Sequence, residues 1–251
     1  TKKKKRDYGL YFRCGKSRLG DFGHLSVASF SDSRYRGVGV KKLIRKAFSE
    51  LNEVAPERLV IDLRGNTGGN LAYVTEIYSY LTEAPFRVVT NFESYSPMAR
   101  SKNLWNGLGR FLVAGVRKRG DRYYRPGVLR QIKPKPESRR YRGRVLVMID
   151  EYTFSAAAML AHLVQSNGRG ELVGADSGNS TTATFGGFFE VFPLYEGRMS
   201  LRIPAYRIDL AKPAPGFLTP DYPVHFSGEH IREGRDPQVE KLLELFGEKK
   251  P

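Results

Sequence analysis

Cysteine is almost absent from this chain of 251 residues. The single cysteine, Cys14, can form neither an internal disulfide nor a cysteine-based zinc site. No two of the four histidines have the spacing of a metal site with a carboxylate, so we expect no metal and no cofactor. No uncharged apolar run approaches the roughly 18 residues of a membrane-spanning helix, and the mean hydropathy is −0.44. These shortages exclude a disulfide scaffold and a membrane-spanning helix within these residues.

Positive charge is abundant but unevenly distributed. The chain has 42 Lys and Arg against 26 Asp and Glu, a net charge of +16. Residues 100–144 contain 15 of the basic residues and only two acidic ones, and residues 2–6 add five more, so the rest of the chain has a net charge of −2. This localisation argues against nucleic acid as a partner, because the fold itself is near neutral. We expect a basic, lid-like insertion at about 95–144, which is either a solvated flap or a contact for an anionic membrane surface or an acidic partner.

The remaining sequence alternates between segments typical of strands and of helices, which predicts an α/β fold. We expect one core domain, 8–251, after a basic tail, 1–7. Apolar residues at helical spacing predict helices over 40–51, 71–81, 156–165 and 237–246. Short apolar or alternating runs predict strands over 8–13, 24–30, 58–63, 86–89, 145–149, 171–174, 185–195 and 199–206.

Two expected strand-to-helix junctions, 62–69 and 152–158, carry residue types suited to nucleophilic catalysis. A helix start offers unpaired N–H groups, so Ser155 at such a start would have donors for an oxyanion beside it. Gly68 and Gly69 would let a second backbone approach without a Cβ. The alternatives are that Ser155 only caps a helix and that the two glycines form a tight turn.

Four separated segments resemble, in order, the successive motifs of the C-terminal processing peptidase family, which includes the tricorn core peptidases and the interphotoreceptor retinoid-binding modules. The segments are LVIDLRGNTGG (59–69), VLVMIDEYTFSAAA (145–158), NGRGELVG (167–174) and LTPDYPV (218–224). The resemblance extends from about Gly23 to Phe246. It implies a crotonase-like (ClpP/crotonase) α/β spiral core of ββα units, and serine endopeptidase chemistry.

The resemblance also implies roles for individual residues. Ser155 would be the nucleophile, and the backbone N–H groups of Gly68 and Ala156 would form the oxyanion hole. The Lys general base of the processing peptidases would lie about 25 residues after the serine, but that position is Ser180, and no Lys occurs between Lys135 and Lys212. The tricorn-like branch takes a His base from a preceding region, so we expect a preceding domain outside this chain.

Other polar residues have less direct assignments. His24 on an expected strand is a hypothetical base within the chain, although a lone strand histidine is more often packed or at the surface. Asp62 and Arg64 are expected to be a structural pair near the site rather than catalytic groups. Asp209 and Asp221 are alternatives for the residue that orients a base.

The leading hypothesis is a tricorn-like serine endopeptidase domain that cleaves extended peptides through an acyl-enzyme on Ser155. The first alternative is a catalytically silent peptide- or ligand-binding module of the same family, which the missing Lys favours. The second alternative is a crotonase-type acyl-CoA enzyme. The resemblance favours a periplasmic or secreted location.

Overall fold

The computed structural model describes residues 10–17, 20–35, 39–94, 117–124, 137 and 139–247. These residues form two compact units. The first unit contains the described residues up to Pro85, from 137 to 179 and from Phe217 onward; the second contains 86–94, 117–124 and 180–216. Within the described ranges, no helix is both long enough and apolar enough to cross a membrane.

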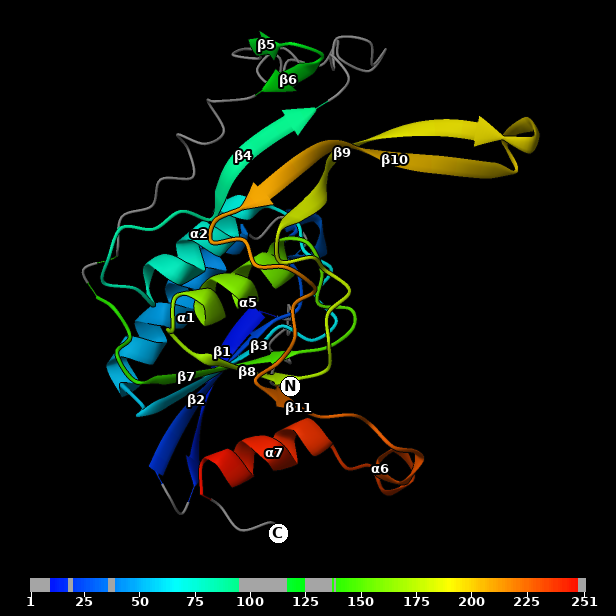
Figure 1. Cartoon of the computed structure of the whole chain (residues 1–251). Coiled ribbons are helices and arrows are strands. Elements are labelled where there is room, and N and C mark those ends of the chain that lie inside the picture. The colour runs from blue at the N-terminus through cyan, green and yellow to red at the C-terminus, as the bar shows by residue number, and fades with distance from the viewer. Residues whose placement is uncertain are drawn as a thin grey trace, which may run out of the picture. The chain divides into compact units, whose positions relative to one another are not determined.

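The first unit is built on a six-stranded sheet with the strand order β1-β2-β3-β7-β8-β11 (Figure 1). The first two strands form an antiparallel hairpin, and every later neighbour pair is parallel. The bounds are β1 Leu10–Ser17, β2 Gly20–Val27, β3 Arg58–Asp62, β7 Arg144–Ile149, β8 Glu171–Gly174 and β11 Tyr222–Pro223. The carboxyl ends of β3, β7 and β8 therefore meet at one edge of the sheet, where ligands bind in open α/β sheets.

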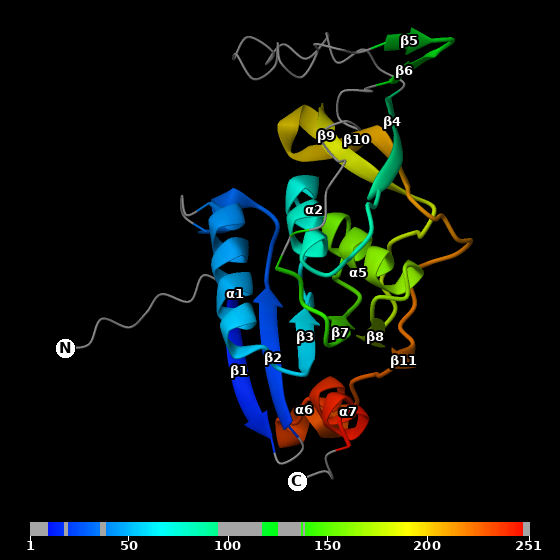
Figure 2. The same ribbon diagram turned by 90° about the vertical axis from the view of Figure 1, so that its left-hand side faces the viewer.

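Helices cover both faces of this sheet (Figures 1 and 2). One face carries α1 (Val40–Val54), α2 (Leu71–Ser79) and α5 (Ala156–Ser166), and the other carries α7 (Pro237–Leu245). Two short helices, η1 (Asp32–Tyr35) and α6 (Gly228–Glu233), lie in connections. On the α7 face, side chains of the central strands pack against the last helix, in a cluster of Val60, Leu146, Met148, Val173, Leu242 and Phe246.

The apolar runs of the sequence explain these elements. Residues 145–149 are all buried, as expected of a parallel strand covered on both faces. In α1 the buried side chains recur at helical spacing, and the helix ends where Ala55 adopts a left-handed conformation ahead of Pro56. The predicted helices over 40–51, 71–81, 156–165 and 237–246 are confirmed to within a few residues at their ends.

The second unit is a five-stranded antiparallel sheet with the order β5-β6-β4-β10-β9. The bounds are β4 Val89–Ser94, β5 Arg117–Arg119, β6 Arg122–Tyr124, β9 Ala183–Leu194 and β10 Met199–Leu210, with a 3-10 turn η3 at Tyr195–Gly197. Near the base of the β9–β10 hairpin, the ring centroids of Phe92 and Tyr206 are 4.5 Å apart, and both rings are buried. This contact is part of the unit's small apolar core.

The distal half of this hairpin, residues 189–194 and 199–204, forms a ribbon that has no such core. We call it the apolar ribbon. Its cross-strand pairs include Leu194 with Met199 and Phe192 with Leu201, and all four side chains are exposed. Tyr195 in the turn is 78% exposed. The ribbon therefore leaves large apolar side chains in solvent.

The structure differs from the sequence-based expectations in several places. The strand expected at 24–30 is β2, which ends at Val27, and the strand expected at 86–89 begins only at Val89. The short hairpin β5–β6 lies inside the expected insertion, 95–144, and joins the second unit through β4. Residues 139–144 instead belong to the first unit. The basic tail, 1–7, lies outside the described residues, and the spiral arrangement of ββα units stays a prediction.

Candidate active site

The loops after β3 and β7 are joined by hydrogen bonds at the carboxyl end of the parallel strands. The Phe154 N–H donates to the Asn66 carbonyl oxygen at 3.0 Å. The Thr153 hydroxyl donates to the Leu63 carbonyl oxygen at 3.1 Å. The two junctions that the sequence singled out are therefore brought together.

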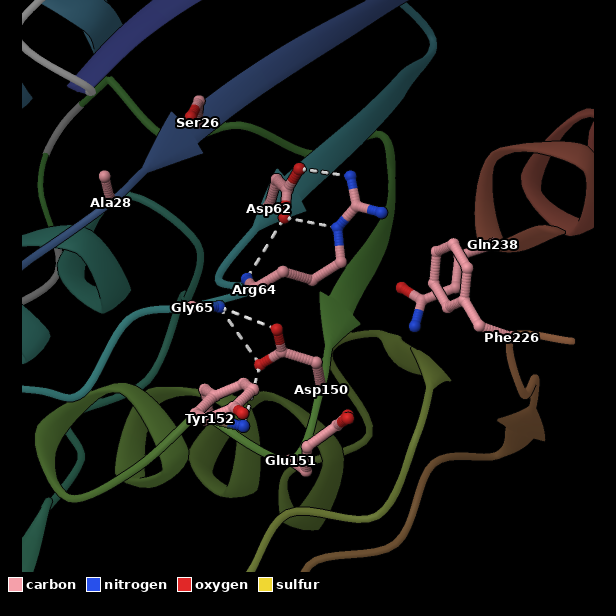
Figure 3. Close-up of a pocket in the computed structure, with 10 residues that line it drawn as sticks. All are labelled: Ser26, Ala28, Asp62, Arg64, Gly65, Asp150, Glu151, Tyr152, Phe226 and Gln238. Atoms are coloured by element: carbon pink, nitrogen blue, oxygen red, sulfur yellow. Dashed lines mark hydrogen bonds and ion pairs between the residues drawn. The ribbon is translucent and has the colours of Figure 1, made fainter. Parts of the chain in front are cut away.

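Asp150 makes a further connection between these loops (Figure 3). Its two carboxylate oxygens lie 2.8 and 3.0 Å from the Gly65 backbone nitrogen and accept from its N–H. Oδ1 also accepts from the Tyr152 N–H at 3.1 Å. Asp150 thus holds the loop after β3 against the start of the segment that leads to Ser155.

A buried side-chain amide, that of Asn66, supports the same loops. Asn66 is fully buried; its Nδ2 donates to the Val27 carbonyl oxygen at 2.8 Å, and its Oδ1 accepts from the Gly68 N–H at 2.9 Å. Each of these bonds satisfies a group that would be costly to bury alone. Asn66 therefore holds the glycine turn against the end of β2.

The loop after β8 completes the arrangement. Ser177 is buried and donates through Oγ to the Thr153 carbonyl oxygen at 2.6 Å. Asn179, also buried, accepts the Ser155 N–H on Oδ1 at 3.1 Å. Three successive strand-to-helix or strand-to-loop junctions are thus bonded around one serine.

Ser155 has an unusual backbone conformation, with φ 51° and ψ −122°. Such angles cost a residue with a Cβ about 1–3 kcal/mol and persist only where the surroundings impose them. Its side chain makes no capping hydrogen bond to α5, although the residue occupies the N-cap position. The alternative that Ser155 is simply a cap is therefore not supported by its side-chain contacts.

Gly68 lies directly against this serine. A Cβ on Gly68 would lie 2.8 Å from both the Ala156 backbone nitrogen and the Ser155 Cβ. The glycine thus keeps space open beside the Ala156 N–H, where an oxyanion would bind. The Gly68 N–H itself, expected as a second donor, is already bonded to Asn66.

Gly69 has a different role. Its φ is 138°, and a Cβ there would collide with the Phe30 carbonyl group. The two residues form an isolated parallel bridge, in which Phe30 N–H donates to Gly68 O at 3.0 Å and Asn70 N–H donates to Phe30 O at 2.9 Å. Gly69 therefore allows the turn to approach the segment after β2.

A charged cluster lies on the α7 face of the sheet. Arg64 donates to Asp62 at 2.8 and 3.0 Å and to Asp236, the N-cap of α7, at 2.6 Å. Burial alone would raise the pKa of Asp62, but hydrogen bonds from His24 and Arg64 outweigh it and hold that pKa well below its usual range. Asp62 and Arg64 thus form an ion pair, which Asp236 extends to α7, and their structural rather than catalytic role stays a prediction.

His24, the hypothetical base, belongs to this cluster. It lies opposite Val60 in the sheet, and its Nε2 is 3.6 Å from Asp62 Oδ2. Val60 packs toward α7, so His24 lies on the face opposite α5. Among the described residues, no hydrogen bond or ion pair joins His24 to Ser155.

The remaining candidates have separate positions. Asp221 accepts from the Leu172 N–H at 2.7 Å and thereby ties β8 to the segment before β11. Asp209 pairs with Arg207 at 2.7 Å in the second unit, to which Ser180 also belongs. In the part of the chain that the structure describes, no three His, Cys, Asp or Glu side chains are grouped to hold a metal ion.

Sequence reasoning missed the supporting residues, chiefly Asn66, Ser177 and Asn179. Each is a polar residue in a turn, and turns are ordinarily polar at the surface. No local signal distinguishes a buried turn amide from an exposed one. The spacing of three junctions after three parallel strands is the signal that could have drawn attention to them.

We compared the chain with a protein-family model, with curated proteins and with solved structures. Residues 21–207, more than half of the chain, match the model of peptidase family S41. No sequence among curated proteins matches the chain significantly.

Solved structures resemble the chain in fold. Mature CPAF is 17% identical with a TM-score of 0.63, and the match covers 94% of this chain and 53% of that one. A Parabacteroides merdae ATCC 43184 protein assigned as a peptidase is 20% identical with a TM-score of 0.59, over 95% and 64%. The photosystem II D1 C-terminal processing protease is 16% identical with a TM-score of 0.55, over 86% and 48%. The chain thus spans roughly half to two thirds of these proteins.

Proposed function

Because the chain belongs to peptidase family S41, we propose that it is the core domain of a serine endopeptidase with Ser155 as the nucleophile. The observation that carries the proposal is the backbone of Ser155, which is held at φ 51° by bonds to Asn179 and through Phe154 to Asn66. A residue held in an unfavourable conformation by three converging loops indicates a functional site. Simple capping would need no such conformation.

The proposed reaction has two stages. Ser155 Oγ gives its proton to a base and adds to the carbonyl carbon of the scissile bond, which forms a tetrahedral oxyanion. The C–N bond then breaks, the amine leaves with a proton, and an acyl-enzyme remains on Ser155. Water gives a proton to the base and adds to the ester carbonyl, the ester bond breaks, Ser155 Oγ takes a proton back from the base, and the free acid departs.

The oxyanion would be stabilised at the start of α5. The Ala156 N–H is the first of the helix, and its nitrogen lies beside the space that Gly68 leaves open. The second proposed donor is the Gly68 N–H. To bind the oxyanion, it would have to share its hydrogen bond between Asn66 Oδ1 and the oxyanion, or give up the bond to Asn66.

We assign the general base, within this proposal, to the tricorn-like arrangement rather than to a Ser-Lys pair. The sequence has no Lys between Lys135 and Lys212, which favours the tricorn-like arrangement in which a base comes from elsewhere in the protein. The same feature favours the second candidate, a catalytically silent module that binds peptides at this site. We also propose a crotonase-like spiral core and a periplasmic or secreted location. The basic insertion would contact an anionic membrane surface or an acidic partner.

Reaction with a fluorophosphonate probe tests the proposal. An activated serine with a formed oxyanion hole should become labelled in the wild-type chain and not in Ser155→Ala. Ser200→Ala, which changes an exposed serine of β10, is the matched control and should be labelled like wild type. The probe is therefore applied to the protein together with the region that supplies the base. If that wild-type protein stays unlabelled while circular dichroism shows it folded, the silent module is favoured.

A further inference from the structure

A pocket opens on the α7 side of the sheet, beside the charged cluster (Figure 3). Its volume is about 470 Å³, within the range of pockets that hold small molecules or single side chains. The lining comes from the carboxyl ends of β2, β3 and β7, from the loop after β7, and from the first turn of α7. No part of the Ser155 mechanism uses it.

Gln238 places an unsatisfied acceptor in this pocket. The residue is 1% exposed, and its Nε2 donates to the Ile149 carbonyl oxygen at 3.3 Å. That bond fixes the amide orientation, because the reverse orientation would bring two oxygens together. Oε1 has no hydrogen-bond partner in the described structure, and Figure 3 shows the amide directed from α7 toward the middle of the pocket. Oε1 is closed to solvent, so a donor from outside reaches it only when the amide turns further into the pocket.

The charges around the pocket specify what kind of donor fits. Three acidic residues line it, Asp62, Asp150 and Glu151, against one basic residue, Arg64. Arg64 is already bonded to two carboxylates, so it does not attract an anion. Glu151 is exposed and makes no hydrogen bond or ion pair with another described residue. The lining thus has a net charge of −2 and more free acceptors than donors.

Aromatic rings stand beside these acceptors. Tyr152 and Phe226 line the pocket and are 65% and 51% exposed. The faces of such rings attract ammonium and guanidinium groups, and their edges shield the aliphatic stem of a long side chain. Acceptors and aromatic rings in one lining are surroundings that suit a cationic side chain.

We propose that this pocket binds the side chain of a lysine or arginine of a peptide, with Gln238 Oε1 and the Glu151 carboxylate as its acceptors. The ammonium or guanidinium group satisfies the buried oxygen and neutralises part of the acidic lining. The site lies at Asp150 to Tyr152, only a few residues before Ser155 in the same loop. The inference concerns binding alone, so it does not depend on peptidase activity.

Fluorescence anisotropy with labelled pentapeptides tests this site. Peptides with a central Lys or Arg should bind at least about tenfold more tightly than peptides with norleucine or citrulline there, which have similar shape and no charge. Comparison of the Lys and Arg peptides shows which cation the pocket prefers. Equal binding of charged and uncharged peptides, or no binding of any of them, would overturn the proposal.

Variants locate the binding. Gln238→Met removes the buried oxygen and should weaken binding of the Lys peptide about tenfold. Glu151→Gln should weaken it about threefold, whereas Glu53→Gln, the same exchange at an exposed site in α1, should leave it unchanged. If Gln238→Met does not fold, the Glu151 and Glu53 pair still decides. Equal effects of these two exchanges would show that only the overall charge attracts the peptide.

Discussion

The two units differ in which side chains they bury and which they expose. In the first unit, buried polar side chains such as Asn66 and Thr153 are hydrogen-bonded, and the sheet is covered on both faces. In the second unit, the apolar ribbon exposes Phe192 and Leu201, and two strands alone can build no core around them. The comparison teaches that positional precision lies in the first unit, where each junction is held by its neighbours.

The units also differ in charge. Residues 86–133 and 180–216 contain 15 Lys and Arg against five Asp and Glu, a net charge of +10. The rest of the chain has +6, of which residues 2–6 supply +5. The basic character of the protein is therefore mostly that of the segments assigned to the second unit. Long-range electrostatic attraction of an acidic partner should depend on them.

The largest effect on stability is expected from Gly69→Ala in the first unit, with Gly186→Ala in the second unit as its control. Gly69→Ala should lower the free energy of unfolding by about 4 kcal/mol or more, because its φ is 138° and the Cβ would collide with Phe30. Gly186→Ala, in β9, has no atom within 4 Å of the new Cβ and no positive φ, so it should change stability by less than about 1 kcal/mol. Urea denaturation of both variants provides the measurement.

Similar losses in the two variants would break the comparison, because they would place equal backbone constraint in both units. A tolerated Gly69→Ala would also mean that the bridge to Phe30 is not required for the fold. Circular dichroism at the start of each titration shows whether either variant is folded.

A smaller effect is expected from the charged cluster, and it should depend on pH. Asp62→Asn should cost about 2 kcal/mol at pH 7, because Arg64 loses the less exposed of its two carboxylate partners. The folded pKa of Asp62 is lowered, so its contribution is complete above an unfolded pKa of about 3.9 and is lost as the pH falls toward the folded pKa. The difference between wild type and variant should therefore shrink below about pH 4.

Asp209→Asn in the second unit is the matched control. Asp209 pairs with Arg207 in a half-exposed site, and such pairs contribute about 0–1 kcal/mol. Denaturant titrations at pH 7, 5, 4 and 3 follow both variants. A pH-independent cost of Asp62→Asn would show that the cluster acts through packing rather than through charge.

The smallest effect on stability is expected in the apolar ribbon. The double change Phe192→Thr and Leu201→Thr should alter the free energy of unfolding by about 1 kcal/mol at most, because both residues are already nearly half exposed. It should reduce self-association measured by analytical ultracentrifugation, because exposed apolar patches promote contact. Leu172→Thr, at a fully buried position in β8, should instead cost about 3 kcal/mol. A large loss in the ribbon variant would mean that the ribbon is packed rather than exposed.

Much of the order of elements could be predicted from the sequence, because its periodicity is strong. The run at 58–63 and the helical spacing at 40–51 each admit one interpretation, and the structure confirms both. The hairpin at 117–124 could not be predicted, since Arg117–Arg119 has no apolar alternation and its place in the sheet depends on distant β4.

The candidate site was predicted less completely. The junctions around Ser155 and Gly68 are visible as glycine and small-residue patterns, but the side chains that hold them come from three loops far apart in sequence. The pocket at Gln238 depends on an amide at the other end of the chain. Such features arise from tertiary contacts and have no local pattern.

The conformation of Ser155 has a consequence for anyone who redesigns this protein. At φ 51° and ψ −122° the backbone prefers glycine, so a design that optimises stability alone would replace this serine first. The residue that we propose as the nucleophile is thus poorly suited to its own backbone conformation. Selection for thermostability would favour glycine at this position, whereas selection for the proposed reactivity would favour serine. A sequence that keeps the serine needs hydrogen bonds from the surrounding loops to offset the unfavourable backbone conformation.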